Sequence, residues 1–282
     1  MKMKKTTRKY LTNTFIYIMM SGLAFTMLFP YFWMISTSFK DKAMAIRVPI
    51  QWIPKPFLFD TYLEIWDMVP LLRGAVNSLK IIIPGITWGQ FVSALAAFSF
   101  SKMDLPKKKT LFLLLMSAML LPDDATMIPR YIIWGKLGLI DTFYPLILPS
   151  LFGGIGSMFF YRQFLNGIPR EYVEAARIDG AGWIKTFITI FIPLMKPAIA
   201  TQVIFGFVGG WNNFMGPLIY LDSEKNMTVQ ICLRLLSSTQ EAVNEYPLVM
   251  TGAVVGSLPI LILYLSFQKY FTDAMVISGV KG

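Results

Sequence analysis

The chain has 282 residues, of which 55% are hydrophobic and 15% are charged. Water-soluble domains carry about 25% charged residues and about 45–50% apolar ones. This composition excludes a disordered chain and argues strongly against a water-soluble globule. A polytopic membrane protein is the class that remains.

The charge and the rare residue types narrow the class further. There are 26 Lys and Arg residues against 16 Asp and Glu, a formal net charge of +10, which suits either nucleic acid or a membrane. The chain has no His and a single Cys, Cys232. It therefore has no His-ligated metal site, no Ser-His-Asp relay, no intrachain disulfide and no Cys cluster for zinc.

Stretches without charged residues locate the membrane spans. A spanning helix needs about 20 mostly apolar residues at about 1.5 Å rise. Five stretches are long enough, and the first is an uncleaved span after a basic leader. A sixth stops at Asp123 and Asp124, which we expect near the far interface, unless it is a re-entrant or interfacial segment. The spans are predicted at about 14–36, 79–101, 110–129, 142–162, 192–220 and 247–268.

We therefore expect an all-α fold of six transmembrane helices, forming one domain over residues 1–282. With the N-terminus in the cytoplasm, 16 of the Lys and Arg residues lie on the inner side and 10 on the outer. Because Lys and Arg are enriched in cytoplasmic loops, this orientation is favoured. Both termini are predicted to be cytoplasmic, and the excess of positive charge indicates a membrane rather than nucleic acid as the partner.

The cytoplasmic loop at about 163–191 contains a predicted amphipathic helix. Its segment IPREYVEAARIDG begins with a proline suited to a helix start and ends at a glycine. At two to three turns it is too short to be stable alone in water, so we expect it to pack on something. The small residues Ala175 and Ala176 allow a partner surface to approach closely. A helix lying on lipid headgroups is the alternative.

At this loop the sequence resembles a known signature. Glu174-Ala175-Ala176 is followed after three residues by Gly180 and, after nine more, by Ile-Phe-Ile-Pro at 190–193. ABC importer permeases share a cytoplasmic signature in which Glu-Ala-Ala is followed after three residues by Gly and, after nine more, by Ile-x-Leu-Pro. The one departure is Ile192 in place of Leu, which keeps the apolar character.

The resemblance extends over nearly the whole chain. The strings LFPYFWMISTSFK, NSLKI, WNNFMGPLI and the terminal GVKG are similar to the carbohydrate-uptake branch of these permeases. The closest likeness is to the smaller, six-span maltose-type subunit.

This resemblance implies a subunit of a binding-protein-dependent ABC importer, in a bacterial-type cytoplasmic (plasma) membrane. The subunit would form half of the path for a sugar, a di- or oligosaccharide. The implied partners are a second, non-identical permease, an ATPase dimer, an extracytoplasmic substrate-binding protein and membrane lipid, with no nucleic acid. The residues implied to couple it to the ATPase are Glu174, Ala175, Ala176, Asp179 and Gly180.

The residues also indicate a subunit without chemistry of its own. The segment GAGWIKT has a Lys-Thr pair but lacks the Gly-x4-Gly-Lys spacing of a phosphate-binding loop. The ATPase must then be a separate polypeptide. We expect no catalytic residue, metal or cofactor here, since ATP and Mg are bound by that partner.

The candidate substrate path lies in the fifth span. Trp211, Asn212 and Asn213 are in an uncharged stretch, where the two amides need partners because unsatisfied polar groups in hydrocarbon are costly. They either line a water-filled cavity or bond another helix at a permease–permease seam. Gln90 and Tyr220 are weaker candidates for the path.

Three other functions compete with the sugar permease. An ABC permease for a non-sugar solute would share the cytoplasmic signature. A membrane-embedded enzyme usually needs His, paired carboxylates or metal ligands at membrane depth. An ion-coupled carrier usually places ionisable groups mid-membrane, and five of the predicted spans have none.

Overall fold

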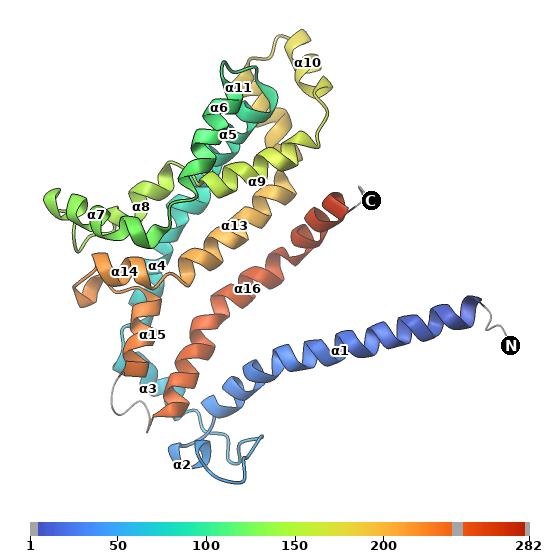
Figure 1. Cartoon of the computed structure of the whole chain (residues 1–282). Coiled ribbons are helices and arrows are strands. Elements are labelled where there is room, and N and C mark those ends of the chain that lie inside the picture. Colours follow the sequence, from blue (N-terminus) through green and yellow to red (C-terminus); the bar gives the residue numbers. More distant parts are fainter. Residues whose placement is uncertain (1–4, 239–244, 280–282) are drawn as a thin grey trace. The chain divides into compact units, whose positions relative to one another are not determined.

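The computed structural model describes residues 5–238 and 245–279, and every regular element in these ranges is a helix (Figure 1). The expected all-α class is confirmed. The helices are α1 (Lys5–Ser38), α2 (Lys42–Ala45), α3 (Asp60–Met68), α4 (Leu71–Pro84), η1 (Gly85–Gly89), α5 (Gln90–Lys102), α6 (Lys108–Ala118), α7 (Asp123–Lys136), α8 (Tyr144–Leu151), α9 (Ile155–Asn166), α10 (Glu171–Ile178), α11 (Trp183–Thr186), η2 (Phe187–Phe191), α12 (Ile192–Leu194), α13 (Lys196–Trp211), α14 (Met215–Tyr220), η3 (Glu224–Asn226), α15 (Val229–Ser238) and α16 (Tyr246–Gly279).

The chain divides into two compact units. Unit 1 comprises Met1–Pro70 and Leu233–Ser257, and unit 2 comprises Leu71–Cys232 and Leu258–Gly282. Unit 2 carries all the predicted coupling and path residues. The expectation of one domain over residues 1–282 stays a prediction.

Four helical segments are long and apolar enough to cross a bilayer. They overlap the first, second, fourth and sixth predicted spans. Pro84 and the π-helical turn η1 lie inside the second segment without ending it, because the missing N–H is absorbed by a local change of helix pitch. The segments are Thr12–Ser38, Leu71–Lys102, Tyr144–Asn166 and Tyr246–Lys269.

The third and fifth predicted spans are bent. The pair Lys108–Ala118 and Asp123–Lys136 bends by 86°, and the pair Trp183–Leu194 and Lys196–Trp211 bends by 78°. The described residues thus supply four spanning helices, or six if each bent pair crosses as one span. Proline explains both breaks, because it has no N–H to continue the helix and restricts the residue before it.

The fifth span therefore differs from the continuous helix expected over 192–220. Pro193 and Pro197 flank the first bend, at Met195. The helix α13 then ends at Trp211, and α14 begins only at Met215.

The core of unit 2 lies where α5 packs along α9. Its α5 side contains Ala94, Ala97 and Phe98, and the small residues let the two helices approach closely. The ring of Phe98 lies 4.9 Å from the ring of Phe191 and 5.3 Å from that of Phe187, both in η2. This cluster makes α5, α9 and η2 one packed body.

Close backbone contact fixes the other end of α5. A Cβ built on Gly89 would lie 2.2 Å from the carbonyl oxygen of Ser150 in α8. Beside it, Ser93 Oγ accepts the Gly154 N–H at 2.9 Å and donates to the Gly89 carbonyl at 2.9 Å. No side chain fits at Gly89 without moving α8.

We expect Gly89→Ala to destabilise the protein by about 1–3 kcal/mol, the usual cost of overfilling a packed core. The measurement is the thermal unfolding midpoint of the purified chain in detergent. Gly209→Ala is the matched control, because it is also a glycine in a transmembrane helix but a Cβ there meets no atom within 4 Å. A midpoint for Gly89→Ala equal to that of Gly209→Ala would contradict the close contact.

Candidate functional site: a coupling helix and a polar cavity

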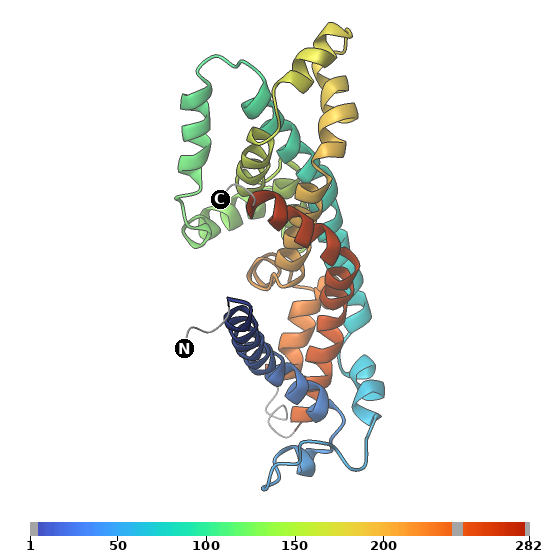
Figure 2. The same ribbon diagram turned by 90° about the vertical axis from the view of Figure 1, so that its right-hand side faces the viewer.

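The predicted amphipathic helix of the cytoplasmic loop is present as α10, at an extremity of unit 2 in both views (Figures 1 and 2). Its inner face buries Val173 and Ala176, which are 3% and 5% exposed. Val173 belongs to the core cluster of α5 and α9. Because α10 has only eight residues, this anchoring rather than intrinsic helix propensity holds it in place.

The signature residues divide between the two faces of α10. Glu174, Ala175, Asp179 and Gly180 are exposed, whereas Ala176 is buried against the chain itself. The small side chain of Ala176 lets α10 lie close to its own core, and the coupling role of the residue stays a prediction.

Gly180 ends the helix in a left-handed conformation. Its φ is +76°, and the Ala181 N–H bonds back to the Ala176 carbonyl at 2.9 Å. This is a common helix C-cap, for which glycine has no steric penalty. A Cβ at Gly180 would meet no atom within 4 Å, so the backbone conformation, and not lack of space, requires glycine.

Two apolar side chains also project from α10. Ile178 is 86% exposed and Tyr172 is 48% exposed. Neither residue stands out in the sequence as a surface residue. The register of so short a helix is set by which residues fit the core, here Val173 and Ala176.

A buried lysine supports the base of α10. Lys102, the last residue of α5, is only 5% exposed, and its Nζ donates to the Ile168 carbonyl at 2.5 Å. Ile168 lies in the connection from α9 to α10. The ammonium group thus joins the end of α5 to the start of the coupling loop.

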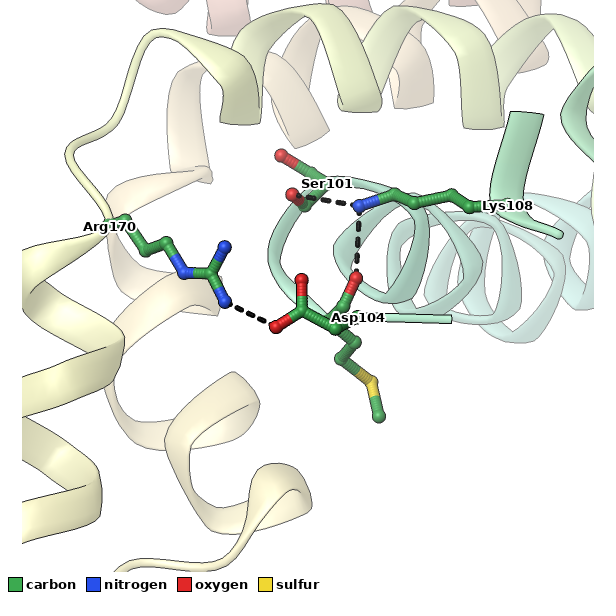
Figure 3. A network of polar contacts seen from close by, with 5 residues as sticks. Ser101, Asp104, Lys108 and Arg170 are labelled. Atoms are coloured by element: carbon green, nitrogen blue, oxygen red, sulfur yellow. Dashed lines mark hydrogen bonds and ion pairs between the residues drawn. The ribbon is translucent and has the colours of Figure 1, made fainter. Parts of the chain in front are cut away.

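An exposed ion pair joins the connection between α5 and α6 to the connection between α9 and α10 (Figure 3). Arg170 Nη2 lies 2.6 Å from Asp104 Oδ2, and Lys108 Nζ donates to the Met103 carbonyl at 2.9 Å. The hydrogen bond and positive charge of Arg170 hold the pKa of Asp104 below its usual value. Solvent screens this pair, so it contributes less to stability than the buried Lys102.

A polar cavity of about 300 Å³ lies among α4, η1, α5, α8, α9, α13 and α14. Its lining combines glycines, aliphatic side chains and uncharged polar groups, with no Asp, Glu, Lys or Arg. The polar side chains that line it are Ser78, Gln90, Ser150, Ser157, Asn213 and Thr228.

A hydrogen-bonded chain at the edge of the cavity links three helices. Tyr161 Oη donates to Gln90 Oε1 at 2.8 Å, and Gln90 Nε2 donates to Ser157 Oγ at 3.3 Å. Ser157 Oγ then donates to Gln202 Oε1 at 2.9 Å. The chain fixes the orientation of the Gln90 amide against α9 and α13.

The structure brings only two of the five predicted path residues to this cavity, namely Gln90 and Asn213. Trp211 is buried with its ring stacked 5.6 Å from that of Phe207. Asn212 and Tyr220 also lie outside the lining. The helix α13 ends at Trp211, so Asn212 and Asn213 lie beyond it. The side chain of Asn213 accepts the N–H of Gly216 at the start of α14.

The cavity also contains residues that sequence reasoning missed. Ser157 and Thr228 line it, although Thr228 follows the outer connection after the fifth span. Neither stands in a motif, and only the fold brings them next to Gln90. Within residues 5–238 and 245–279, no group of three or more Cys, Asp or Glu side chains is placed to hold a metal ion.

Comparisons with known proteins agree on one family. A family model described as "Binding-protein-dependent transport system inner membrane component" matches residues 3–277. The arabinooligosaccharides transport system permease protein AraQ of Bacillus subtilis (strain 168) is 32% identical, over 95% of this chain and 94% of that protein. The lactose transport system permease protein LacG of Rhizobium radiobacter is 28% identical, over 97% and 98%.

A solved structure shares the fold. It is the crystal structure of a bacterial ABC transporter involved in the import of the acidic polysaccharide alginate. One of its chains superimposes with a TM-score of 0.80 at 20% identity, over 96% of this chain and 99% of that one. At this identity the likeness concerns the fold alone.

Replacing Lys102 should loosen the base of α10. Lys102→Met keeps the apolar stem but leaves the Ile168 carbonyl without its donor, a loss of about 1–3 kcal/mol for a buried acceptor. We expect faster hydrogen–deuterium exchange at residues 168–178, measured by mass spectrometry. Lys109→Met is the control, since Lys109 is exposed nearby. Equal exchange in the two variants would show that Lys102 does not hold the loop.

Proposed function

Because the chain belongs to the family of binding-protein-dependent transport system inner membrane components, we propose that it forms half of the path of a sugar importer. The solute is a di- or oligosaccharide, and a separate ATPase supplies the energy. The observation that carries this proposal is α10: four of the five predicted coupling residues are exposed, while its inner face is anchored in the core of α5 and α9.

Two observations support a sugar as the solute. Relatives that match almost the full length of this chain are named for arabinooligosaccharides and for lactose. The cavity in unit 2 offers hydroxyl and amide groups beside aliphatic surface, the combination that suits the two faces of a sugar ring.

The outward face of α10 suits a cleft on the ATPase. Glu174 can pair with a basic residue of that partner, and Ala175 leaves room for a close approach. Ile178 supplies the apolar anchor, since burying such a side chain stabilises a complex by about 1.5–3 kcal/mol. The bond from Lys102 to the Ile168 carbonyl prevents α10 from swinging freely, so a push on α10 reaches α5.

The remaining partners and the orientation follow from the resemblance and the charge distribution. We expect a second, non-identical permease, an ATPase dimer, an extracytoplasmic binding protein and surrounding lipid. Both termini lie in the cytoplasm, as the excess of Lys and Arg on that side predicts. Trp211, Asn212 and Tyr220 stay predictions for the path, at a seam with the second permease.

Removing the apolar anchor should weaken docking to the ATPase and so lower uptake together with the ATP hydrolysis that the sugar stimulates. In the complete transporter reconstituted in liposomes, Ile178→Ser should lower sugar uptake and sugar-stimulated ATP hydrolysis about tenfold. Folding should be unaffected, because Ile178 is exposed in the isolated subunit. The matched control is Glu171→Gln, which changes an exposed residue of the same helix outside the signature. Wild-type uptake by Ile178→Ser would contradict docking through this face.

The orientation has its own test. Alkaline phosphatase, which is active only outside the cytoplasm, should be inactive when fused after Gly282, and green fluorescent protein at the same site should fluoresce. A second fusion of each reporter after Asp60, in the segment predicted to lie outside, should give the reverse. An active phosphatase after Gly282 would overturn the model with both ends inside.

A further inference from the structure

We propose that the cavity of unit 2 is a binding subsite of this subunit for one neutral sugar ring, and that it rejects anionic solutes. The proposal rests on the proposed function, in which the solute is a sugar. It adds where this subunit binds the sugar and that the sugar carries no charge. It places direct substrate contacts on this chain rather than on the second permease alone.

The size of the cavity suits a single ring. Its volume of about 300 Å³ lies at the lower end of the range for small-molecule sites, roughly 300–1,000 Å³. It corresponds to about ten water molecules at about 30 Å³ each. A whole oligosaccharide would extend beyond it, whereas one ring of the chain fits.

The cavity has hydrogen-bonding capacity that the protein itself does not use. Thr228 is 3% exposed, and its Oγ1 is buried without a hydrogen-bond partner among the described residues. A buried polar group left unpaired costs about 1–3 kcal/mol. Gln90 Oε1 and Asn213 Oδ1 accept hydrogen bonds within the protein, and Asn213 is an exposed residue of the lining. A ligand that both donates and accepts satisfies these groups, as a sugar hydroxyl does.

The absence of charge in the lining determines the charge class. No lining residue is ionisable, so a carboxylate or phosphate entering this cavity would lose water without gaining a counter-charge from the lining. Removing water from an unpaired charge is far more costly than removing it from a neutral hydroxyl. Ile82, Ile86 and Leu146 supply the aliphatic surface that the C–H faces of a ring need. The cavity therefore suits neutral glycosides and excludes uronates and sugar phosphates.

Thr228→Val tests the subsite directly. The replacement keeps the shape of the side chain and removes a hydroxyl that has no hydrogen-bond partner among the described residues, so it breaks no hydrogen bond there. In liposomes with the complete transporter and its binding protein, uptake is measured for arabinotriose, lactose, melibiose and digalacturonate. We expect uptake of at least one neutral sugar and none of digalacturonate. Thr228→Val should raise the KM for the transported sugar at least fivefold with kcat little changed.

Thr201→Val is the matched control. Thr201 is also a buried threonine, but it lies in α13 outside the cavity lining and its Oγ1 bonds the Pro197 carbonyl. We expect its KM to equal that of the wild type. Thermal unfolding midpoints of both variants check that each is folded, and a misfolded Thr228→Val is replaced by Thr228→Ser, which keeps the hydroxyl and should retain the wild-type KM.

The outcomes separate this proposal from the proposed function. Uptake of digalacturonate overturns the neutral subsite and leaves a carbohydrate permease. An unchanged KM in Thr228→Val, or an equal rise in Thr201→Val and Thr228→Val, overturns the subsite in the same way. A fivefold higher KM for Thr228→Ser than for the wild type also contradicts it, since the hydroxyl is retained. If none of the four carbohydrates is transported, the proposed function fails and the subsite with it.

Discussion

The hydrogen bond from the Lys102 ammonium to the Ile168 carbonyl is the contact on which the site in unit 2 depends. The helix α10 is too short to hold its own conformation, so its position is decided at its base and along its inner face. Val173 provides the packing there, and Lys102 fixes the connection that leads into the helix. In the function proposed above, a force applied to the outer face of α10 would reach α5 through these contacts.

The helix α5 joins the coupling end to the cavity. Gln90 begins it and Lys102 ends it, a distance of about 18 Å at 1.5 Å per residue. At the first end Gln90 bonds Ser157 and lines the cavity, and at the second Lys102 holds the coupling loop. The helices α5 and α9 form one packed body through Ala94, Ala97 and Phe98. A rigid-body shift of this pair is the simplest way for one subunit to change the cavity when α10 is displaced.

The sequence predicted the helical class, the position of most spans and the existence of α10, because these depend on composition and on runs without charge. It did not predict the bends, which depend on how the helix continues where prolines such as Pro193 and Pro197 supply no backbone N–H. It also did not predict that Ala176 is buried, because on an eight-residue helix packing against α5 and α9 decides which side chains are buried. The sequence could not identify Thr228 as a cavity residue, since only the fold brings it into the same lining as Gln90.

A cluster of basic residues and the uncharged cavity lie at opposite ends of α5. Lys102, Lys108, Arg162 and Arg170 gather where α5 and α9 end, and there they bond backbone carbonyls or Asp104. At the other end of α5 the cavity lining has no ionisable group. An ion-coupled carrier needs a titratable or ion-binding group beside its substrate, because the ion and solute must bind to the same conformational state. A cavity whose lining has no ionisable residue instead suits transport driven from outside, through displacement of α10.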